Sequence, residues 1–226
     1  MKVKKNNIII YVILLLVLIT SDSVVNNTIR MYNAASIPSL TKIQKMKRTV
    51  VRVEVDTGHG SGVVVSEDGL IITNKHVIKG SKNIRVIIQE DIYNNVRVVY
   101  IAPDLDIAFL KVEPIRDLNY ARIKSYDKYT HGDEVYTIGN PLGFNKFVSK
   151  GIISKFIIKP NYSVHILTDA TILEGSSGGG LFSEDGRLIG VTTATYRQTR
   201  KDINHNTRIG FAISSKEFKL LIKILR

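Results

Sequence analysis

The feature that most constrains the fold of this chain is a succession of short runs rich in β-branched residues. The runs are separated by Gly, Asp, Asn or Pro, and their Val, Ile and Thr residues favour strands over helices. Many short strands at this spacing predict a β-sandwich or β-barrels, not alternating strands and helices. The runs read TVVRVEV, SGVVVS, LIIT, IRVII, VRVVYI and IAFLKV, then EVYTIG, KGIISKF, VHILT, RLIGVTTAT and RIGFAI.

Two nearly identical turns indicate that the strands form two units. SEDGLI occupies residues 66–71 and SEDGRLIG occupies residues 183–190, and in each the Asp-Gly pair suits a tight hairpin between apolar strands. One such hairpin in each half predicts two similar all-β units, at about 48–118 and 125–213.

The last segment predicts a helix over residues 214–226. Ser214 and Glu217 have the spacing of a capping box, which marks a helix N-terminus. The apolar residues that follow fall on one helical face, which we expect to pack against the second unit. They are Phe218, Leu221, Ile222 and Leu225.

The N-terminus has the character of an export signal. Three lysines precede an apolar run over residues 8–19, which as a helix would span about 18 Å, well short of a membrane core of roughly 30 Å. We expect residues 1–23 to be a signal peptide or an uncleaved signal anchor, and the rest of the protein to lie outside the cytoplasm. A buried core helix of a cytosolic domain is the alternative. Residues 24–47 form an N-terminal segment, with a short helix expected over residues 36–48.

The composition excludes several kinds of chemistry. There is no cysteine, so the chain has no disulfide, no thiolate metal site and no thiol nucleophile. The formal charge of +12 is spread along the chain without basic runs interleaved with aromatics, which argues against nucleic-acid binding. We expect no metal and no cofactor, because four of the histidines lack metal-ligand spacing. They are His59, His131, His165 and His205.

The stretch LEGSSGGGLFSEDG, residues 173–186, raises the question of a nucleophile. A phosphate-binding loop would need Lys and Ser or Thr after its last glycine, and Leu181 follows here. A linker would stay polar, whereas apolar sequence flanks this stretch. The G-x-S-x-G pattern around Ser177 also matches a hydrolase elbow, but that motif requires a helix next and a catalytic His later, and a hairpin follows instead.

The remaining arrangement places a histidine and an aspartate before the serine. A serine hydroxyl needs a base to take its proton, and that base needs an orienting carboxylate. TNKHVI places His76 at the end of an apolar strand, and PDLDIAFLKV places Asp106 at the start of another, with Asp104 as the alternative carboxylate. Glycines around a serine let backbone N–H groups turn inward to bind an oxyanion.

Taken together, five ordered motifs resemble those of the HtrA/DegP group of serine proteases. The similarity runs from about residue 37 to the last residue and implies an all-β, chymotrypsin-like fold of two six-stranded antiparallel β-barrels with a C-terminal helix. The barrels would occupy about 48–118 and 125–213, within a protease domain over 48–226. The motifs are GSGVVVSEDGLIITNKHVI, DLDIAFLKV, GNPLG, TDATILEGSSGGGLFSEDGRLIGV and GFAI.

This resemblance assigns a role to each candidate residue. His76 would be the general base, Asp106 its orienting partner and Ser177 the nucleophile. The backbone N–H groups of Gly175 and Ser177 would form the oxyanion hole. Ser176 would be a neighbour of the nucleophile.

The resemblance also implies where a polypeptide substrate would bind. Ile172 would line an apolar specificity pocket suited to small aliphatic residues, with a core role as the alternative. The substrate backbone would pair with the strand through Thr192, Thr193 and Ala194 by β-augmentation, with a plain core strand as the alternative.

Three departures from the family pattern bear on function. Gly180 stands where the family commonly has Pro, and Glu174 brings a negative charge close to the expected oxyanion. We also expect no PDZ domain, because the chain ends with the terminal helix. The resemblance implies a serine endopeptidase acting on unfolded or extracytoplasmic proteins, with a silent protease-like binding module and a chaperone-like holdase as alternatives. It also implies a homotrimer, for which Met31 and Tyr32 are candidate contacts.

Overall fold

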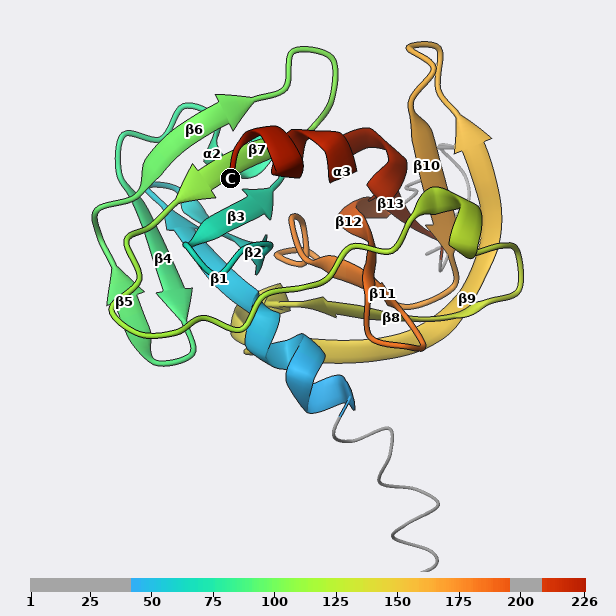
Figure 1. The fold of residues 1–226 in the computed structure, drawn as a ribbon, viewed down its shortest axis with the longest axis horizontal. Helices are drawn as coiled ribbons and strands as arrows, with labels where there is room; N and C mark the ends of the chain where they lie inside the picture. Colours follow the sequence, from blue (N-terminus) through green and yellow to red (C-terminus); the bar gives the residue numbers. More distant parts are fainter. Residues whose placement is uncertain (1–41, 196–208) are drawn as a thin grey trace, which may run out of the picture. The chain divides into compact units, whose positions relative to one another are not determined.

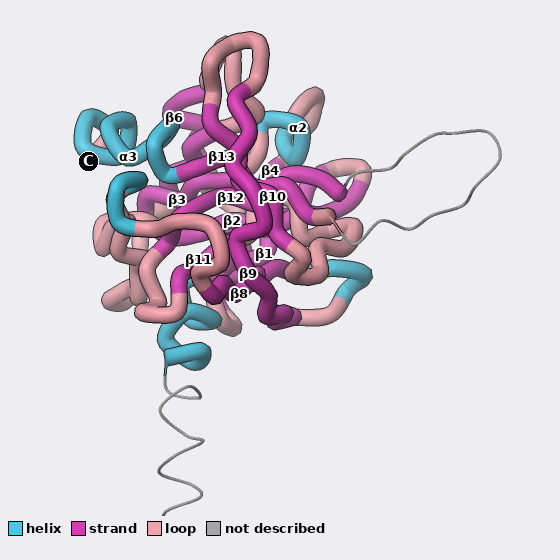
Figure 2. The backbone as a smooth tube through the Cα atoms, turned by 90° about the vertical axis from the view of Figure 1, so that its right-hand side faces the viewer, coloured by secondary structure: helices cyan, strands magenta, loops and turns pink. Residues whose placement is uncertain are grey.

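Strands dominate the regular structure in the computed structural model, which describes residues 42–195 and 209–226. Residues 43–226 form one unit by their internal contacts. Thirteen strands in the described part of the chain form two sheets, one from each half of the sequence. Figure 1 shows β1–β7 on the left and β8–β13 on the right, and Figure 2 turns β9 and β10 toward the viewer.

The first half is one antiparallel sheet in the order β5-β4-β1-β2-β3-β7-β6. Alternate residues of its strands, such as Val53, Ile71 and Leu110, are fully buried in a core of their own. The strands are β1 (Val50–Val55), β2 (Gly58–Val64), β3 (Leu70–Thr73), β4 (Ile84–Ile88), β5 (Asp91–Tyr93), β6 (Arg97–Ile101) and β7 (Ala108–Lys111).

This sheet has seven strands and is open, where the sequence predicts six strands in a closed barrel. The additional strand is β5, which folds back on β4 after a turn in which Gln89 has a φ of +57°. Its three residues are too few to produce a recognisable alternation, so the sequence pattern does not reveal it.

The second half is a closed barrel in the order β10-β13-β12-β11-β8-β9. Its six strands agree with the prediction for this half. Ile153, Ile166 and Ile189 lie in its fully buried interior. The strands are β8 (Glu134–Gly139), β9 (Phe147–Ile158), β10 (Val164–Thr168), β11 (Gly180–Ser183), β12 (Leu188–Thr195) and β13 (Gly210–Ser214).

A third apolar core joins the two halves and is covered by the terminal helix α3 (Ser215–Ile224). Phe109 of the first half, Phe182 of the second and Phe218 of α3 are its largest fully buried side chains. The helix crosses above both halves in Figure 1. The predicted C-terminal helix is therefore confirmed, and it contacts both halves, not the second alone.

The capping box predicted for α3 is only half formed. Ser214 is the N-cap and its Oγ accepts the N–H of Lys216 at 3.2 Å. The carboxylate of Glu217 accepts the N–H of Val164 at 2.9 Å. Glu217 therefore ties α3 to the start of β10.

The other helices of the described chain are short. They are a helix over residues 42–49, α2 (Lys75–Ile78), η1 (Tyr126–Lys128) and η2 (Pro141–Gly143). None of the helices within residues 42–195 and 209–226 has the length and apolarity needed to cross a membrane. The predicted leader over 1–23 and the proposed trimer contacts Met31 and Tyr32 lie outside the described residues.

Candidate active site

The first half of the fold brings His76 and Asp106 together. β3 ends at Thr73, and the short helix α2 that follows carries His76, while Asp106 lies in the loop between β6 and β7. His76 Nδ1 lies 2.6 Å from Asp106 Oδ2, and the backbone N–H of His76 donates to Oδ1 at 2.9 Å. Asn74 holds the other side of the loop, because its Nδ2 donates to the carbonyl of Asp106 at 2.8 Å.

Asp106, and not Asp104, is the carboxylate that faces His76. Asp104 is exposed, and its backbone carbonyl accepts a hydrogen bond from Asn161. Burial alone would raise the pKa of Asp106, but hydrogen bonds from His76 and Thr193 outweigh it and hold the pKa below the ordinary value. Asp106 is therefore ionised at neutral pH.

Thr193 links this pair to Ser177. Its Oγ1 donates to Asp106 Oδ2 at 2.8 Å, and its backbone carbonyl accepts the hydroxyl of Ser177 at 3.0 Å. The hydroxyl of Ser177 is thus directed to β12 and makes no hydrogen bond to His76 in this structure. From the sequence, the backbone of Thr193 was predicted to pair with a substrate, and its hydroxyl had no predicted role.

The loop that carries Ser177 depends on two glycines with left-handed backbones. Gly175 and Gly178 have φ values of +88° and +86°. A Cβ on Gly178 would lie 2.0 Å from the carbonyl oxygen of Ser61. Only glycine fits this conformation and this contact.

Two anchored carbonyls orient the N–H groups predicted to form the oxyanion hole. Glu174 O accepts the N–H of Leu142 at 3.2 Å, and Ser176 O accepts the N–H of Gly179 at 2.9 Å. Because C=O and N–H point in opposite directions across a trans peptide, the N–H groups that follow these carbonyls turn the other way. They belong to Gly175 and Ser177, and neither donates to an acceptor within residues 42–195 and 209–226.

Thr192 reinforces the second of these anchors. Its Oγ1 donates to Ser176 O at 2.7 Å. Its backbone N–H and C=O pair with Gly179 and Gly178 of the serine loop. Both backbone groups of Thr192, which was predicted to pair with a substrate, are therefore already used within the protein.

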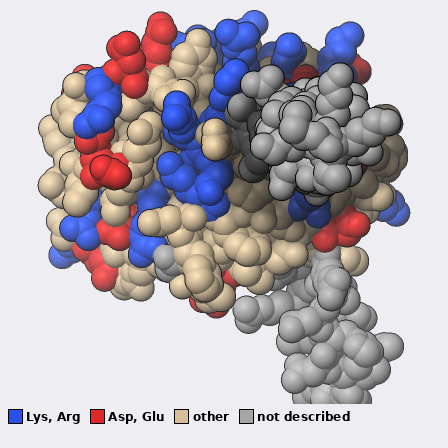
Figure 3. All heavy atoms as spheres, turned by 90° about the horizontal axis from the view of Figure 1, so that it is seen from below, with Lys and Arg blue, Asp and Glu red and all other residues tan. Residues whose placement is uncertain are grey.

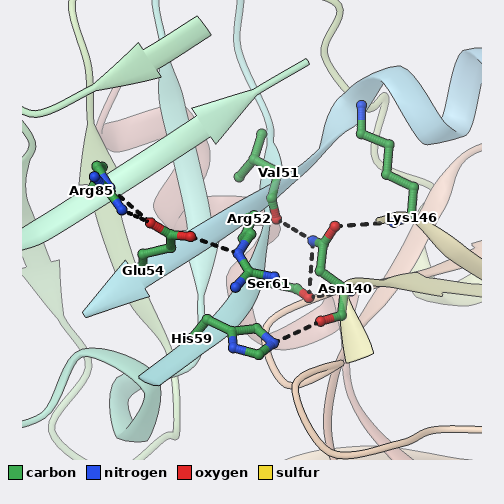
Figure 4. A network of polar contacts seen from close by, with 8 residues as sticks. All are labelled: Val51, Arg52, Glu54, His59, Ser61, Arg85, Asn140 and Lys146. Atoms are coloured by element: carbon green, nitrogen blue, oxygen red, sulfur yellow. Dashed lines mark hydrogen bonds and ion pairs between the residues drawn. The ribbon is translucent and has the colours of Figure 1, made fainter. Parts of the chain in front are cut away.

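Ser61 of β2 holds the serine loop from the first half of the fold. Its backbone N–H donates to Ser177 O at 2.8 Å, and its Oγ donates to Gly175 O at 2.8 Å. Asn140, after β8, contacts the same hydroxyl, and its Nδ2 donates to Val51 O at 2.8 Å (Figure 4). The motifs that contain Ser61 and Asn140 were recognised in the sequence, but neither residue could be assigned a role, because these contacts join segments far apart in the chain.

The structure accounts for two of the departures from the family pattern. Glu174 is exposed. Gly180 is held in the sheet between Ile138 and Val191, and a Cβ on it would lie 2.2 Å from the ring of Phe182. The space that a side chain would need at Gly180 is therefore filled by its own strand.

Ile172, before the serine loop, and Ser176, within it, are both buried. The Cδ1 of Ile172 lies 2.5 Å from where a Cβ on Gly210 would stand, so it packs against the start of β13. Ser176 Oγ accepts the N–H of Leu173 at 3.4 Å and lies against Gly139. The backbone of Ala194 pairs with Phe211 of β13.

A His-Asp pair from one β-half and a glycine-held serine from the other define a chymotrypsin-like protease fold. The chain belongs to the family of trypsin-like peptidase domains, whose family model matches residues 60–191, more than half of the chain. This confirms the family and the fold class expected from the sequence.

Individual relatives bear HtrA, DegP and MamE names. The chain is 36% identical over 171 residues to the magnetosome formation protease MamE of Paramagnetospirillum magneticum, covering 72% of this chain and 23% of the relative. It is 34% identical over 167 residues to the periplasmic serine endoprotease DegP of Escherichia coli, covering 72% of this chain and 34% of the relative. The serine protease HTRA4 of Mus musculus is 34% identical over 164 residues, with 69% and 34% covered. The chain thus spans about a quarter to a third of the length of these relatives.

Proposed function

We propose that this chain is a serine-type endopeptidase that uses Ser177, His76 and Asp106. The observation that carries the proposal is the position of Thr193 between them. Its hydroxyl contacts the carboxylate that binds His76, and its carbonyl contacts the hydroxyl of Ser177. Membership of the trypsin-like peptidase family supports the same chemistry.

In the proposed mechanism Ser177 Oγ attacks the carbonyl carbon of the scissile peptide bond. A C–O bond forms while His76 Nε2 takes the hydroxyl proton, and Asp106 stabilises the resulting imidazolium. The N–H groups of Gly175 and Ser177 bind the oxyanion. The C–N bond then breaks, and the leaving amine takes the proton from His76. In the second stage water attacks the acyl carbon while His76 takes a proton from it. The C–O bond to Ser177 then breaks, and His76 returns the proton to Ser177 Oγ.

A short rotation would prepare Ser177 for this reaction. Its hydroxyl now donates to Thr193 O, and a change of χ1 would redirect it toward His76. Catalytic hydrogen bonds are often long or misdirected without substrate and form in the complex.

The substrate is proposed to be an unfolded polypeptide bound along β12. The pairs of β12 with β11 end at Val191, while its pairs with β13 continue to Thr195. Its edge beyond Thr192 can therefore accept an extended peptide. An apolar specificity pocket for small aliphatic residues beside Ile172 stays a proposal from the family resemblance, because the buried side chain of Ile172 packs against Gly210 as a core residue would.

The proposed setting is outside the cytoplasm. The lysines and apolar run of the leader favour export, and the name of the related E. coli protein describes that relative as periplasmic. We retain residues 48–226 as the proposed protease domain. Two further features stay proposals. One is attachment to a membrane through the leader, and the other is assembly into a homotrimer.

The test is degradation of unfolded casein by the full chain beside a Ser177→Ala variant, with a fluorophosphonate probe. We expect wild-type protein to cleave and to be labelled, and the variant to do neither. A folded wild-type protein that neither cleaves nor labels would overturn the proposal. Binding of casein without cleavage would then favour the binding module or the holdase.

A further inference from the structure

A groove of about 750 Å³ begins beside the candidate active site and extends over the first sheet. Gly58 and His59, at the start of β2, line one end of it. His59 Nε2 lies 3.0 Å from where a Cβ on Gly175 would stand, and two residues further along β2, Ser61 binds Ser177. The end of the groove that His59 lines therefore lies next to the serine loop.

Strand register places a charged row across the groove. His59 is opposite Glu54 on β1, and Glu54 is opposite Arg85 on β4. Figure 4 shows Arg85, Glu54 and Arg52 joined by hydrogen bonds, with His59 nearby. Since neighbouring strands are roughly 4.8 Å apart, Arg85 is about 10 Å from His59, or about three residues of extended peptide.

The carboxylates of the groove are already bound by neighbouring donors. Glu54 accepts Arg52 Nε at 2.9 Å and Arg85 Nε at 2.8 Å, and it also accepts Arg85 Nη2. Burial opposes its ionisation, but these hydrogen bonds outweigh burial and hold the pKa of Glu54 below its ordinary value.

Asp56 is bound in the same manner. It accepts the backbone N–H of Lys82 at 2.7 Å and Nδ2 of Asn83 at 2.9 Å. Hydrogen bonds from Asn83, and then from Lys82, hold the pKa of Asp56 below its ordinary value.

Some hydrogen-bond donors of the groove, by contrast, have no acceptor in the described part of the protein. Arg52 uses only Nε on Glu54, and Lys82 Nζ has no acceptor among the residues that the structure describes. Arg85 binds Glu54 through Nε and Nη2 and keeps Nη1. Together these residues give the lining three cations against two carboxylates. The groups of the groove that are free to bind a ligand are thus cationic donors, and these suit a carboxylate.

We propose that this groove binds acidic side chains on the C-terminal side of the scissile bond. A peptide paired antiparallel to β12 runs from Thr195 toward Thr193 and Ser177, so the part that leaves the site continues over β2 into the groove. Asp or Glu about two to four residues beyond the cleaved bond then meets Arg85 and Lys82. This inference rests on the proposed endopeptidase function and names the substrate feature that the site selects.

The test is a cleavage-site profile of the full chain on a peptide library of known sequences, read by mass spectrometry. We expect enrichment of Asp and Glu two to four residues after the cleaved bond. For one cleaved peptide and its Asp→Asn analogue, kcat/KM should differ by about fivefold at low salt and less at high salt. The Lys82→Gln/Arg85→Gln variant should lose this difference, and Arg116→Gln, whose arginine lies outside the groove and pairs with Asp91, should keep it.

The outcomes separate the two proposals. Fluorophosphonate labelling and cleavage without acidic enrichment, or with enrichment unchanged in the groove variant, would overturn the groove assignment alone. Absence of both labelling and cleavage would overturn the endopeptidase function and the groove assignment with it. Retained cleavage of the neutral analogue by the groove variant serves as the check that this variant is folded.

Discussion

Thr193 and His76 bind the same oxygen of Asp106, at 2.8 Å and 2.6 Å. One residue of the second half therefore completes the coordination of a carboxylate supplied by the first. The hydroxyl of Thr193 fixes the orientation of the Asp106 carboxylate, and through it the orientation of the imidazole.

Replacing Thr193 by Val should remove the hydroxyl contact to Asp106 and keep the backbone carbonyl. A hydrogen bond to a charged group is worth about 1.5–3 kcal/mol, so kcat/KM should fall about tenfold to a hundredfold. Thr193→Ser keeps the hydroxyl and should retain most activity. Equal losses in the two variants would mean that the methyl group, not the hydroxyl, matters.

Asp106→Asn should reduce kcat by about 10⁴, because the amide cannot hold His76 in the required tautomer. Asp104→Asn is the matched control, since Asp104 is exposed and two residues away. Steady-state kinetics on one peptide compares them. If instead Asp104→Asn proved the more damaging change, the triad would need a different carboxylate.

The stability of the protein should depend on pH through Asp106. Its folded-state pKa lies below the ordinary 3.8, so the carboxylate contributes stability above that pH and loses it as the pH falls through the folded value. Denaturant unfolding of wild type and Asp106→Asn should give free energies that converge below about pH 4. A constant difference down to pH 2 would contradict this linkage.

Ser61→Ala should reduce the stabilisation of the transition state more than the binding of the substrate. Without Oγ, the carbonyl of Gly175 loses its anchor and Asn140 loses an acceptor, so the oxyanion loop gains freedom. We expect kcat to fall about tenfold or more with KM little changed. Ser154→Ala, at an exposed position of β9, should behave as wild type.

Lys146→Met should stabilise the protein. Lys146 is half-buried, and burial followed by repulsion from Lys47 and Arg48 lowers its pKa. Figure 3 shows several Lys and Arg side chains close together near the middle of the face seen from below. The charge is thus a cost to the folded state at pH 7, and this cost disappears as the pH rises above 10.5.

Lys146→Met should raise the free energy of unfolding by up to about 1 kcal/mol at pH 7, and by less at high salt. Thermal unfolding at several salt concentrations measures it. Lys155→Met, an exposed lysine of β9, serves as the control and should give no gain. A destabilised Lys146→Met variant would mean that the methylene chain, and not the charge, determines the effect.

The sequence was sufficient to predict elements whose signal is local. β8 and β10 match the predicted runs residue for residue, and the Asp-Gly turns before β3 and β12 occur where expected. The pairing of His76 with Asp106 was predicted from the family resemblance, because the position of each residue beside an apolar strand left Asp104 as an alternative.

The residues that the sequence could not reveal act through contacts between distant segments. Ser61 and Gly175 are separated by 114 positions, and small polar residues such as Ser61 and Asn140 occur in many turns. Glu217 had the spacing of a local cap and bonds to Val164 instead. In each case the deciding partner is set by packing between segments, which no local pattern records.

The hydrogen bonds from Ser61 to the serine loop have a consequence for how this protein gains and loses its chemistry. His76 and Asp106 belong to the first half and Ser177 to the second, so in the proposed mechanism the nucleophile meets its base only when both halves have folded and docked. The contacts of Ser61 with the serine loop form in that same step. The proposed activity would therefore depend on the interface between the halves, and not on the stability of either half alone.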